Sequence, residues 1–333
     1  MPLIRSWVKS ANSPNTNFPL NNLPYGVFTV NNQDPHCCVA IGDMILDITL
    51  LEKNNIISPS SRTCVFQDPS WNKFMELGSS SWAKFRAELT ALLKEHPVES
   101  KVDKEKVLTP FLFPQAKCIL HKPFNVSEFT DFFASYHHAK NVGTMFRGPE
   151  NALPPNWLHM PIGYNGRAST VVVSGTQITR PMGQLKPPTE DIPYFGPSKR
   201  FDFELELGAI IGTKSESGER LSIEESDDMI FGYVILNDWS ARDIQAWEYQ
   251  PLGPFQAKAT ATTISPWIVT KAALEPFRTS TPKPQKPLLK YLEENGPMLY
   301  NINLSVSITT NQSKKAHEIV RSNYSEMYYS SGQ

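Results

Sequence analysis

Prolines interrupt this chain at short intervals. The sequence has 28 prolines among 333 residues, about 8%, whereas average proteins have about 5%. Proline lacks the backbone N–H that helix interiors and central strands use, so it concentrates in loops, at edges and at element ends. We therefore expect short strands, long ordered loops and few long helices.

The remaining composition is that of a globular protein. Apolar residues make up 40% of the chain, and the formal net charge is −1. A chain of this composition can bury a hydrophobic core. It lacks the excess of basic residues that favours binding to nucleic acid or to anionic membranes. Its four cysteines include the adjacent pair Cys37 and Cys38 and form no Cys-x-x-Cys zinc pattern. No apolar run approaches the ~18 residues of a membrane span. We therefore expect a cytoplasmic protein that binds neither nucleic acid nor membrane.

The chain is expected to divide into two units, residues 1–118 and 119–333. In the first unit, short strands at 25–30, 38–41 and 44–48 are joined by a hairpin turn at Gly42-Asp43. A helix is expected from Ser80 to His96, with its apolar face formed by Trp82, Phe85, Leu89, Leu92 and Leu93. Strands with one amphipathic helix indicate a small barrel with a helical appendage.

The second unit contains longer apolar and alternating runs. Residues 170–173 and 230–236 have the composition of buried strands, and residues 302–308 alternate as a half-exposed strand does. Residues Ser174-Gly175 indicate a hairpin turn. We expect a helix from about Ser322, so that the strand at 302–308 has no later partner.

Carboxylates in this unit suggest a metal site. Glu204 and Glu206 are two residues apart in an alternating strand, so both point from one face. Asp238 ends an apolar strand, and Asp131 lies in an aromatic-rich loop. Four converging carboxylates need a divalent cation, and an all-oxygen set suits Ca²⁺ or Mg²⁺. The alternative is that the two glutamates line the exposed face of an edge strand.

Two further groups are candidates for chemistry. Four of the seven histidines lie between residues 121 and 159, and the pair His137-His138 is a candidate base, although such a pair often has only structural roles. If residues 240–249 are helical, Arg242, Gln245 and Tyr249 share a face that could stabilise an oxyanion, or the segment is simply a surface helix.

Several long motifs occur in a fixed order along the chain. They include Asp131-x-Phe-x4-His138-Ala-x-Asn-Val-Gly143, Met145-Phe-Arg-Gly-x-Glu-Asn-Ala-Leu153, Phe203-Glu-Leu-Glu206, Asn237-Asp-Trp-Ser-Ala-Arg-Asp-Ile-Gln245 and Trp247-Glu-Tyr-x-Pro-Leu-Gly-Pro-Phe255. Together they resemble the fumarylacetoacetase family from about Trp7 to about Tyr328. The resemblance implies a mainly β, α+β fold, with an SH3-like barrel ahead of a fumarylacetoacetate-hydrolase-type mixed β-roll, and usually a homodimer.

The resemblance also implies roles for individual residues. His138 corresponds to the general base, and Arg242, Gln245 and Lys258 correspond to donors near the scissile bond. The Ca²⁺ ligands correspond to Asp131, Glu204, Glu206 and Asp238, and a Mg²⁺ site corresponds to Asp238, Lys258 and Thr262. Positions that contact the small-molecule substrate correspond to Phe133, Arg147, Tyr164, Gln245 and Tyr249. The implied reaction is metal-dependent hydrolysis of 4-fumarylacetoacetate to fumarate and acetoacetate, the last step of tyrosine and phenylalanine degradation.

The sequence also departs from the family pattern. Phe133 stands where tyrosine is usual, Asn165 replaces a frequent histidine, and Ala257 and Ala261 replace glycines near Lys258. From Ser330 the match stops, and the family's C-terminal segment is expected to be missing. That segment carries a glutamate that orients the catalytic histidine. One alternative is therefore an inactive truncated form of the enzyme. Another is a different member of the superfamily, such as an acylpyruvate hydrolase or oxaloacetate decarboxylase, but the N-terminal barrel and the motif Trp247-Glu-Tyr-x-Pro-Leu-Gly-Pro254 count against it.

Overall fold

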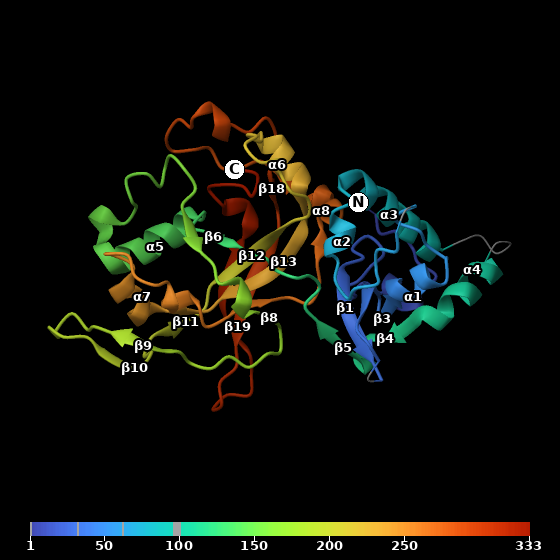
Figure 1. Ribbon diagram of the computed structural model, residues 1–333, viewed down its shortest axis with the longest axis horizontal. Helices are drawn as coiled ribbons and strands as arrows, with labels where there is room; N and C mark the ends of the chain where they lie inside the picture. The colour runs from blue at the N-terminus through green and yellow to red at the C-terminus, as the bar shows by residue number, and fades with distance from the viewer. Residues whose placement is uncertain (1, 32, 62, 96–100) are drawn as a thin grey trace.

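The computed structural model, which describes residues 2–31, 33–61, 63–95 and 101–333, has the mainly β, α+β architecture that the sequence predicts. Figure 1 shows two groups of elements side by side, with the N-terminal strands and helices in blue and the later elements in green to red. Within the described residues, no helix is both long and apolar enough to cross a membrane.

The N-terminal sheet is antiparallel, and its strands run in the order β4-β3-β2-β1-β5. They are β1 (Tyr25–Val30), β2 (His36–Ile41), β3 (Met44–Asp47), β4 (Leu112–Pro114) and β5 (Cys118–His121). Only the 3-10 turn η4 (Gln115–Lys117) separates the two edge strands β4 and β5. Three such residues span about 6 Å, so the sheet curls until its edges approach, which is the expected small barrel. The predicted hairpin turn is present, with Gly42 at φ +59°.

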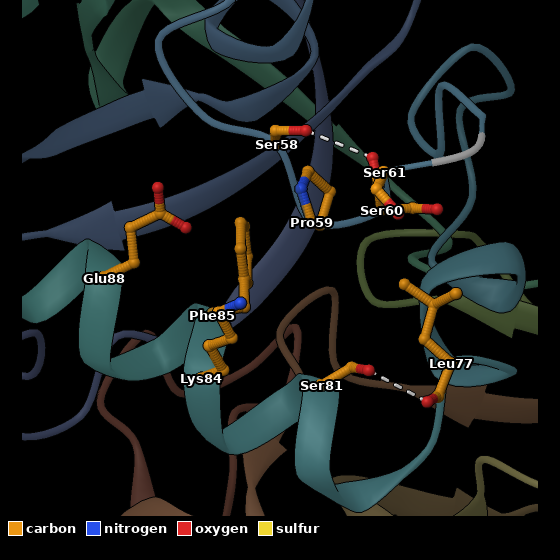
Figure 2. Close-up of a pocket in the computed structure, with 9 residues that line it drawn as sticks. All are labelled: Ser58, Pro59, Ser60, Ser61, Leu77, Ser81, Lys84, Phe85 and Glu88. Carbon is orange, nitrogen blue, oxygen red and sulfur yellow. Dashed lines mark hydrogen bonds between the residues drawn. The ribbon is translucent and has the colours of Figure 1, made fainter.

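Helix α3 (Ser79–Leu93) packs on this barrel through Trp82, Phe85, Leu89 and Leu93, as the apolar spacing predicts. The helix ends at Leu93, because Lys94 is extended, so it stops before the predicted end at His96, a residue that lies outside the described ones. Other N-terminal helices are η1 (Lys9–Asn12), α1 (Ile48–Lys53), α2 (Asn72–Met75), α4 (Lys101–Leu108) and η3 (Thr109–Phe111). A cavity of about 350 Å³ lies between the Ser58–Ser61 loop and α3 (Figure 2). It contains none of the predicted site residues.

A second five-stranded sheet is built around β13 (Ile230–Asp238), which pairs with β12 (Leu205–Ile211), β15 (Thr262–Ile264) and β16 (Val269–Thr270). β8 (Val171–Val173) adds to β15 in parallel. Residues 230–234 are all buried, in agreement with the apolar run in the sequence. The predicted hairpin at Ser174-Gly175 is wrong, because β8 has no partner directly after it in the chain.

Smaller elements surround this sheet. The two-stranded pairs are β6 (Thr130–Phe132) with β7 (Gly163–Asn165), β9 (Met182–Leu185) with β10 (Tyr194–Pro197), β11 (Phe201–Asp202) with β14 (Ser240–Ala241), and β17 (Arg278–Thr279) with β18 (Leu299–Tyr300). The helices are α5 (Tyr136–Arg147), η5 (Pro149–Asn151), η6 (Ala168–Thr170), α6 (Ile223–Met229), α7 (Arg242–Glu248), η7 (Gln256–Lys258), α8 (Lys271–Leu274), η8 (Glu275–Phe277), η9 (Lys290–Leu292) and η10 (Tyr324–Glu326).

The expected helix from Ser322 is wrong. Residues His317–Asn323 form β20, which pairs with β19 (Asn303–Ile308) as an antiparallel hairpin, and only the short turn η10 follows. The β-branched Ile319 and Val320 favour the extended form, and pairing with β19 satisfies the backbone of both strands. The alternating strand at 302–308, for which the sequence predicted no later partner, therefore pairs with β20.

The two groups of elements share one hydrophobic cluster. Tyr25 of β1 stacks on Trp71 with ring centroids 4.3 Å apart, and its ring lies 5.7 Å from that of Phe231 in β13. The backbones of Tyr25 and Ile268 exchange hydrogen bonds of 2.9 and 2.8 Å. The start of the central strand β13 is thus anchored on the barrel, and its other end is free to carry polar groups. The unit boundary at residues 118/119 remains a proposal.

We predict that Phe231→Ala lowers the free energy of unfolding by about 3–5 kcal/mol, because it opens a cavity between Tyr25, Phe74 and Trp82. Urea denaturation measures this loss. Phe277→Ala is the matched control, since Phe277 is 53% exposed and its loss should cost less than about 0.5 kcal/mol. Equal losses in the two variants would contradict the shared-core assignment.

Candidate active site

Polar side chains gather where β12, β13 and β15 meet at one end of the second sheet. Asp238 is the last residue of β13, and Thr262 of β15 is its direct partner in register. On the other side, Leu205 of β12 pairs with Asn237, so Glu204 and Glu206 flank that pair and point to one face. The ends of three neighbouring strands therefore bring these residues together.

Four carboxylates form the centre of this site. Asp131, Glu204, Glu206 and Asp238 each offer an oxygen, and these oxygens all lie within 4.8 Å of one another. Asp131 comes from β6, where it pairs with Tyr164 of β7. Glu204 and Asp238 are buried at 7% and 3% exposure. The sequence interpretation of Glu204 and Glu206 as an exposed edge is thus excluded, and this cluster could bind a metal ion.

Two cationic side chains enter the acidic cluster. The Lys258 ammonium contacts Asp238, lies 2.7 Å from Glu204 Oε2 and lies 3.3 Å from Asp131 Oδ2. Arg242, at the start of α7, places Nη1 2.7 Å from Glu204 Oε1 and donates from Nε to Asp202 at 2.9 Å. Buried like charges at this spacing repel strongly, so both cations are needed to hold the carboxylates together.

His138 lies at the first turn of α5, directly above the cluster. Ser135 caps this helix by accepting a hydrogen bond from the His138 backbone N–H. The ring's Nε2 is 3.4 Å from Glu204 Oε1, and Phe133 packs edge-on against the ring at 5.4 Å. The side chain is 37% exposed, so one side of the imidazole remains open to a substrate or water. The neighbouring His137 is exposed and faces Tyr136 instead.

The acid groups respond unequally to this environment. Burial, together with the charges of Asp131, Glu204 and Asp238, raises the pKa of Glu206 well above its ordinary value. Burial likewise raises the pKa of Asp238 to about 8, although Lys258 opposes it. For Glu204, burial is outweighed by the His138 hydrogen bond and the nearby cations, which hold its pKa well below the usual range. The cluster thus retains protons at neutral pH unless a further cation binds.

The residues present fit a hard divalent cation. Every ligand atom of the acidic cluster is a carboxylate oxygen, which is the donor set of Ca²⁺ and Mg²⁺. Thr262 supplies a further observation: its hydroxyl Oγ1 is buried and has no hydrogen-bond partner among the described residues. Because it pairs with Asp238 across the strands, this oxygen lies beside the cluster.

Of the other predicted residues, Gln245 and Tyr164 contact the two cations of the cluster, whereas the contacts of Tyr249 and Arg147 lie elsewhere. Gln245 accepts a hydrogen bond from Arg242 at 3.1 Å, and the Tyr164 ring lies 5.8 Å from the Lys258 ammonium. Tyr249 follows α7, and its ring packs edge-on against Phe146 near the end of α5. Arg147 donates from Nε and Nη2 to the backbone carbonyls of Asn151 and Ala152, which fix one side of its guanidinium.

Sequence reasoning missed two residues that support this site. Asp202 fixes Arg242, and the alternation of residues 202, 204 and 206 could have indicated it. Glu248 is buried and accepts hydrogen bonds from the backbone N–H groups of Gln256 and Ala257, at 3.0 and 2.7 Å. It thereby fixes η7, which carries Lys258. No local pattern predicts this contact.

Comparison with known proteins identifies the family. Residues 128–333 match the fumarylacetoacetate hydrolase C-terminal family, and residues 21–123 match the fumarylacetoacetase N-terminal family. Fumarylacetoacetase of Rattus norvegicus is 47% identical over 94% of this chain and 75% of its own length. That of Arabidopsis thaliana is 44% identical over 99% of this chain and 78% of its own. The chain belongs to the fumarylacetoacetase family.

A solved structure agrees with this fold. The crystal structure of Cg1458 with inhibitor matches with a TM-score of 0.51 at 15% identity, over 93% of this chain and 80% of the other.

We predict that the metal-free protein loses stability as the pH rises from about 4 to about 8. A carboxyl whose pKa is raised by folding stabilises the fold fully below its unfolded value, near 4, and this contribution is lost as the pH rises through the folded value. For Asp238 that folded pKa is about 8. The Tm measured in chelator should therefore fall more steeply with rising pH for the unmodified chain than for Asp238→Asn. Parallel curves would contradict the raised pKa.

Proposed function

We propose that this chain hydrolyses a carbon–carbon bond of 4-fumarylacetoacetate and releases fumarate and acetoacetate. This reaction would place it at the last step of tyrosine and phenylalanine degradation. The family relationship supports a hydrolase acting on carbon–carbon bonds of ketonic substances. The observation that carries the proposal is the convergence of four carboxylates with His138, Arg242 and Lys258 at one end of the sheet.

The proposal includes two metal sites. Ca²⁺ would be held by Asp131, Glu204, Glu206 and Asp238, and Mg²⁺ by Asp238, Lys258 and Thr262. Lys258 would contribute its backbone carbonyl to the Mg²⁺ site, because its charged ammonium has no lone pair to offer a metal. The all-oxygen donor set and the buried, unpartnered Thr262 hydroxyl support these assignments. When bound, a divalent cation acts as a Lewis acid that polarises the diketone oxygens and delocalises the charge of the leaving enolate.

His138 is proposed as the general base. It takes a proton from water as the water oxygen bonds to the attacked carbonyl carbon. The carbon–carbon bond then breaks, its electron pair passes to the leaving enolate, and the proton held on His138 returns to the enolate carbon. The contact of Nε2 with Glu204, which remains ionised, favours the protonated imidazole formed in the first step.

Arg242, Gln245 and Lys258 are proposed as donors to the negative charge that develops on oxygen. Arg242 is the best fixed of the three, because Asp202 and Glu204 hold two sides of its guanidinium. It in turn holds Gln245. These contacts keep the donors in place before substrate binds, so little reorganisation is needed during the reaction.

Substrate contacts are proposed for Phe133, Arg147, Tyr164, Gln245 and Tyr249. Phe133 presents an apolar face beside His138, and Tyr164 lies beside Lys258. Arg147 is a suitable partner for the fumarate carboxylate: its Nε and Nη2 donate to two backbone carbonyls, and further N–H groups of the guanidinium remain for that anion. Tyr249 packs on Phe146, so the C-terminal end of α7, which carries Tyr249, lies against the C-terminal end of α5, which carries Arg147.

The runner-up function is a catalytically inactive form of the enzyme. This chain spans about three quarters of the length of the curated relatives. Among the described residues, the His138 ring has its polar contact with Glu204 alone, so its second nitrogen lacks an orienting partner. The homodimer and the cytoplasmic location remain predictions; the four free cysteines are consistent with a reducing compartment.

We predict metal-dependent turnover of fumarylacetoacetate by the purified 333-residue chain, followed as loss of its ultraviolet absorbance. Activity should be supported by Ca²⁺ and abolished by a chelator, with circular dichroism showing that the protein stays folded. A folded chain that is inactive with Ca²⁺ and Mg²⁺ would favour the inactive form. Turnover that is insensitive to chelator would contradict the metal assignment.

We also predict that His138→Ala lowers kcat by about 10²–10⁴-fold, the usual contribution of a general base, and leaves Ca²⁺ affinity within a few-fold. Calorimetric titration measures the affinity. His137→Ala is the matched control, since this exposed neighbour contacts Tyr136 and not the acidic cluster, and it should retain full activity. Near-normal turnover by His138→Ala would overturn the base assignment.

A further inference from the structure

The ammonium of Lys258 lies inside the acidic cluster. It contacts three of the four carboxylates: Asp238 Oδ2, Glu204 Oε2 at 2.7 Å and Asp131 Oδ2 at 3.3 Å. The side chain is only 8% exposed, so water cannot replace these contacts. A buried lysine with three carboxylate partners is a counterion in its own right.

The three carboxylates that bind this ammonium are among the four that a metal ion would need. Ca²⁺ takes oxygen ligands at about 2.3–2.6 Å, whereas charge-assisted N–H···O contacts have lengths of about 2.7–2.9 Å. A lysine ammonium and a calcium ion that bind the same carboxylates therefore place their charges close together. In this arrangement the ammonium competes with a metal ion for Glu204 and Asp238.

Charge balance indicates that Lys258 neutralises only part of the negative charge that a divalent metal ion would neutralise. Fully ionised, as a metal ion requires, the four carboxylates carry four negative charges, and Lys258 and Arg242 supply two positive ones. Among the described residues, Glu206 is the member of the cluster that forms no ion pair, although its carboxylate oxygen lies within 4.8 Å of those of the other three. Lysine thus holds the cluster together but leaves it short of positive charge.

We propose that Lys258 is a built-in competitor of the metal ion: its ammonium stabilises the acidic cluster in the metal-free protein and withdraws from the shared carboxylates when a divalent cation binds. This inference rests on the proposed metal-dependent function. It assigns Lys258 two successive tasks, because an ammonium released from the carboxylates becomes available as a donor to the substrate.

The backbone around Lys258 suits such an exchange. Glu248 accepts from the N–H groups of Gln256 and Ala257, so the start of η7 is fixed independently of the lysine side chain. Phe255, which precedes η7 with φ +59°, packs edge-on against Tyr164. Only the flexible four-carbon stem has to change conformation. A substitution that removes the ammonium therefore leaves these loop anchors in place.

Calcium titration of Lys258→Met tests the proposal. Methionine has a similar length and removes the charge. We expect its Ca²⁺ dissociation constant to fall at least tenfold below that of the unmodified chain. We also expect a lower Tm in chelator and a larger rise in Tm when Ca²⁺ is added. Neither readout depends on activity.

Lys271→Met is the matched control. Lys271 is also largely buried and pairs with Asp227 at 3.0 Å and Asp228 at 3.6 Å, outside the acidic cluster. Its loss should lower the Tm with and without Ca²⁺ and leave the Ca²⁺ dissociation constant unchanged. This control separates competition for the metal from the general cost of losing a buried lysine.

The outcomes distinguish the two levels of inference. Unchanged or weaker Ca²⁺ binding by Lys258→Met would overturn the competitor role and leave the proposed function intact. Failure of the unmodified chain to bind Ca²⁺ would overturn both. If Lys258→Met unfolds without metal, the stabilising half of the proposal is supported. Its affinity is then measured on protein purified with Ca²⁺, by competition with a chromophoric chelator, and must still exceed that of the unmodified chain.

Discussion

Mutual repulsion among four carboxylates is the constraint on which the arrangement of the second unit depends. Asp131, Glu204, Glu206 and Asp238 place their oxygens within 4.8 Å of one another, and moving such charges out of water costs several kcal/mol each unless they are paired. Lys258 and Arg242 supply that pairing from two different helices. Ion pairs with the acidic cluster, as well as hydrophobic packing, therefore hold α7 and η7 against this end of the sheet.

The central strand β13 connects this charged centre to the apolar core. Its first residues are buried against the barrel, where Phe231 contacts Tyr25 and Trp82, and its last residue is Asp238. A strand with one anchored apolar end can hold a carboxylate at the other end in a fixed position. The barrel thus contributes to the site through rigidity, although none of its residues belongs to the acidic cluster.

The sequence predicted the parts of the site that depend on local periodicity. Alternation at residues 203–207 predicted that Glu204 and Glu206 point the same way, and the apolar run 230–236 placed Asp238 at a strand end. Both placements are confirmed, although the strand itself begins only at Leu205. Insertion of Lys258 among the carboxylates depends on a contact 127 residues away along the chain, with Asp131, which no local pattern contains. The helix expected from Ser322 was wrong for a related reason. Ser322 belongs to β20, and the extended form of β20 depends on its pairing with β19.

Arg242 and Lys258 both supply positive charge to the acidic cluster, but they differ in how firmly each charge is held. The planar guanidinium of Arg242 is held by Asp202, Glu204 and Gln245 in three directions, and such a fork loses several directed hydrogen bonds if it moves. The ammonium of Lys258 is a point charge on a flexible stem, so it can leave one set of oxygens for another at lower cost. This difference supports the proposed roles, in which the fixed cation of Arg242 lies beside the reacting bond and the exchangeable cation of Lys258 lies where a metal ion would enter.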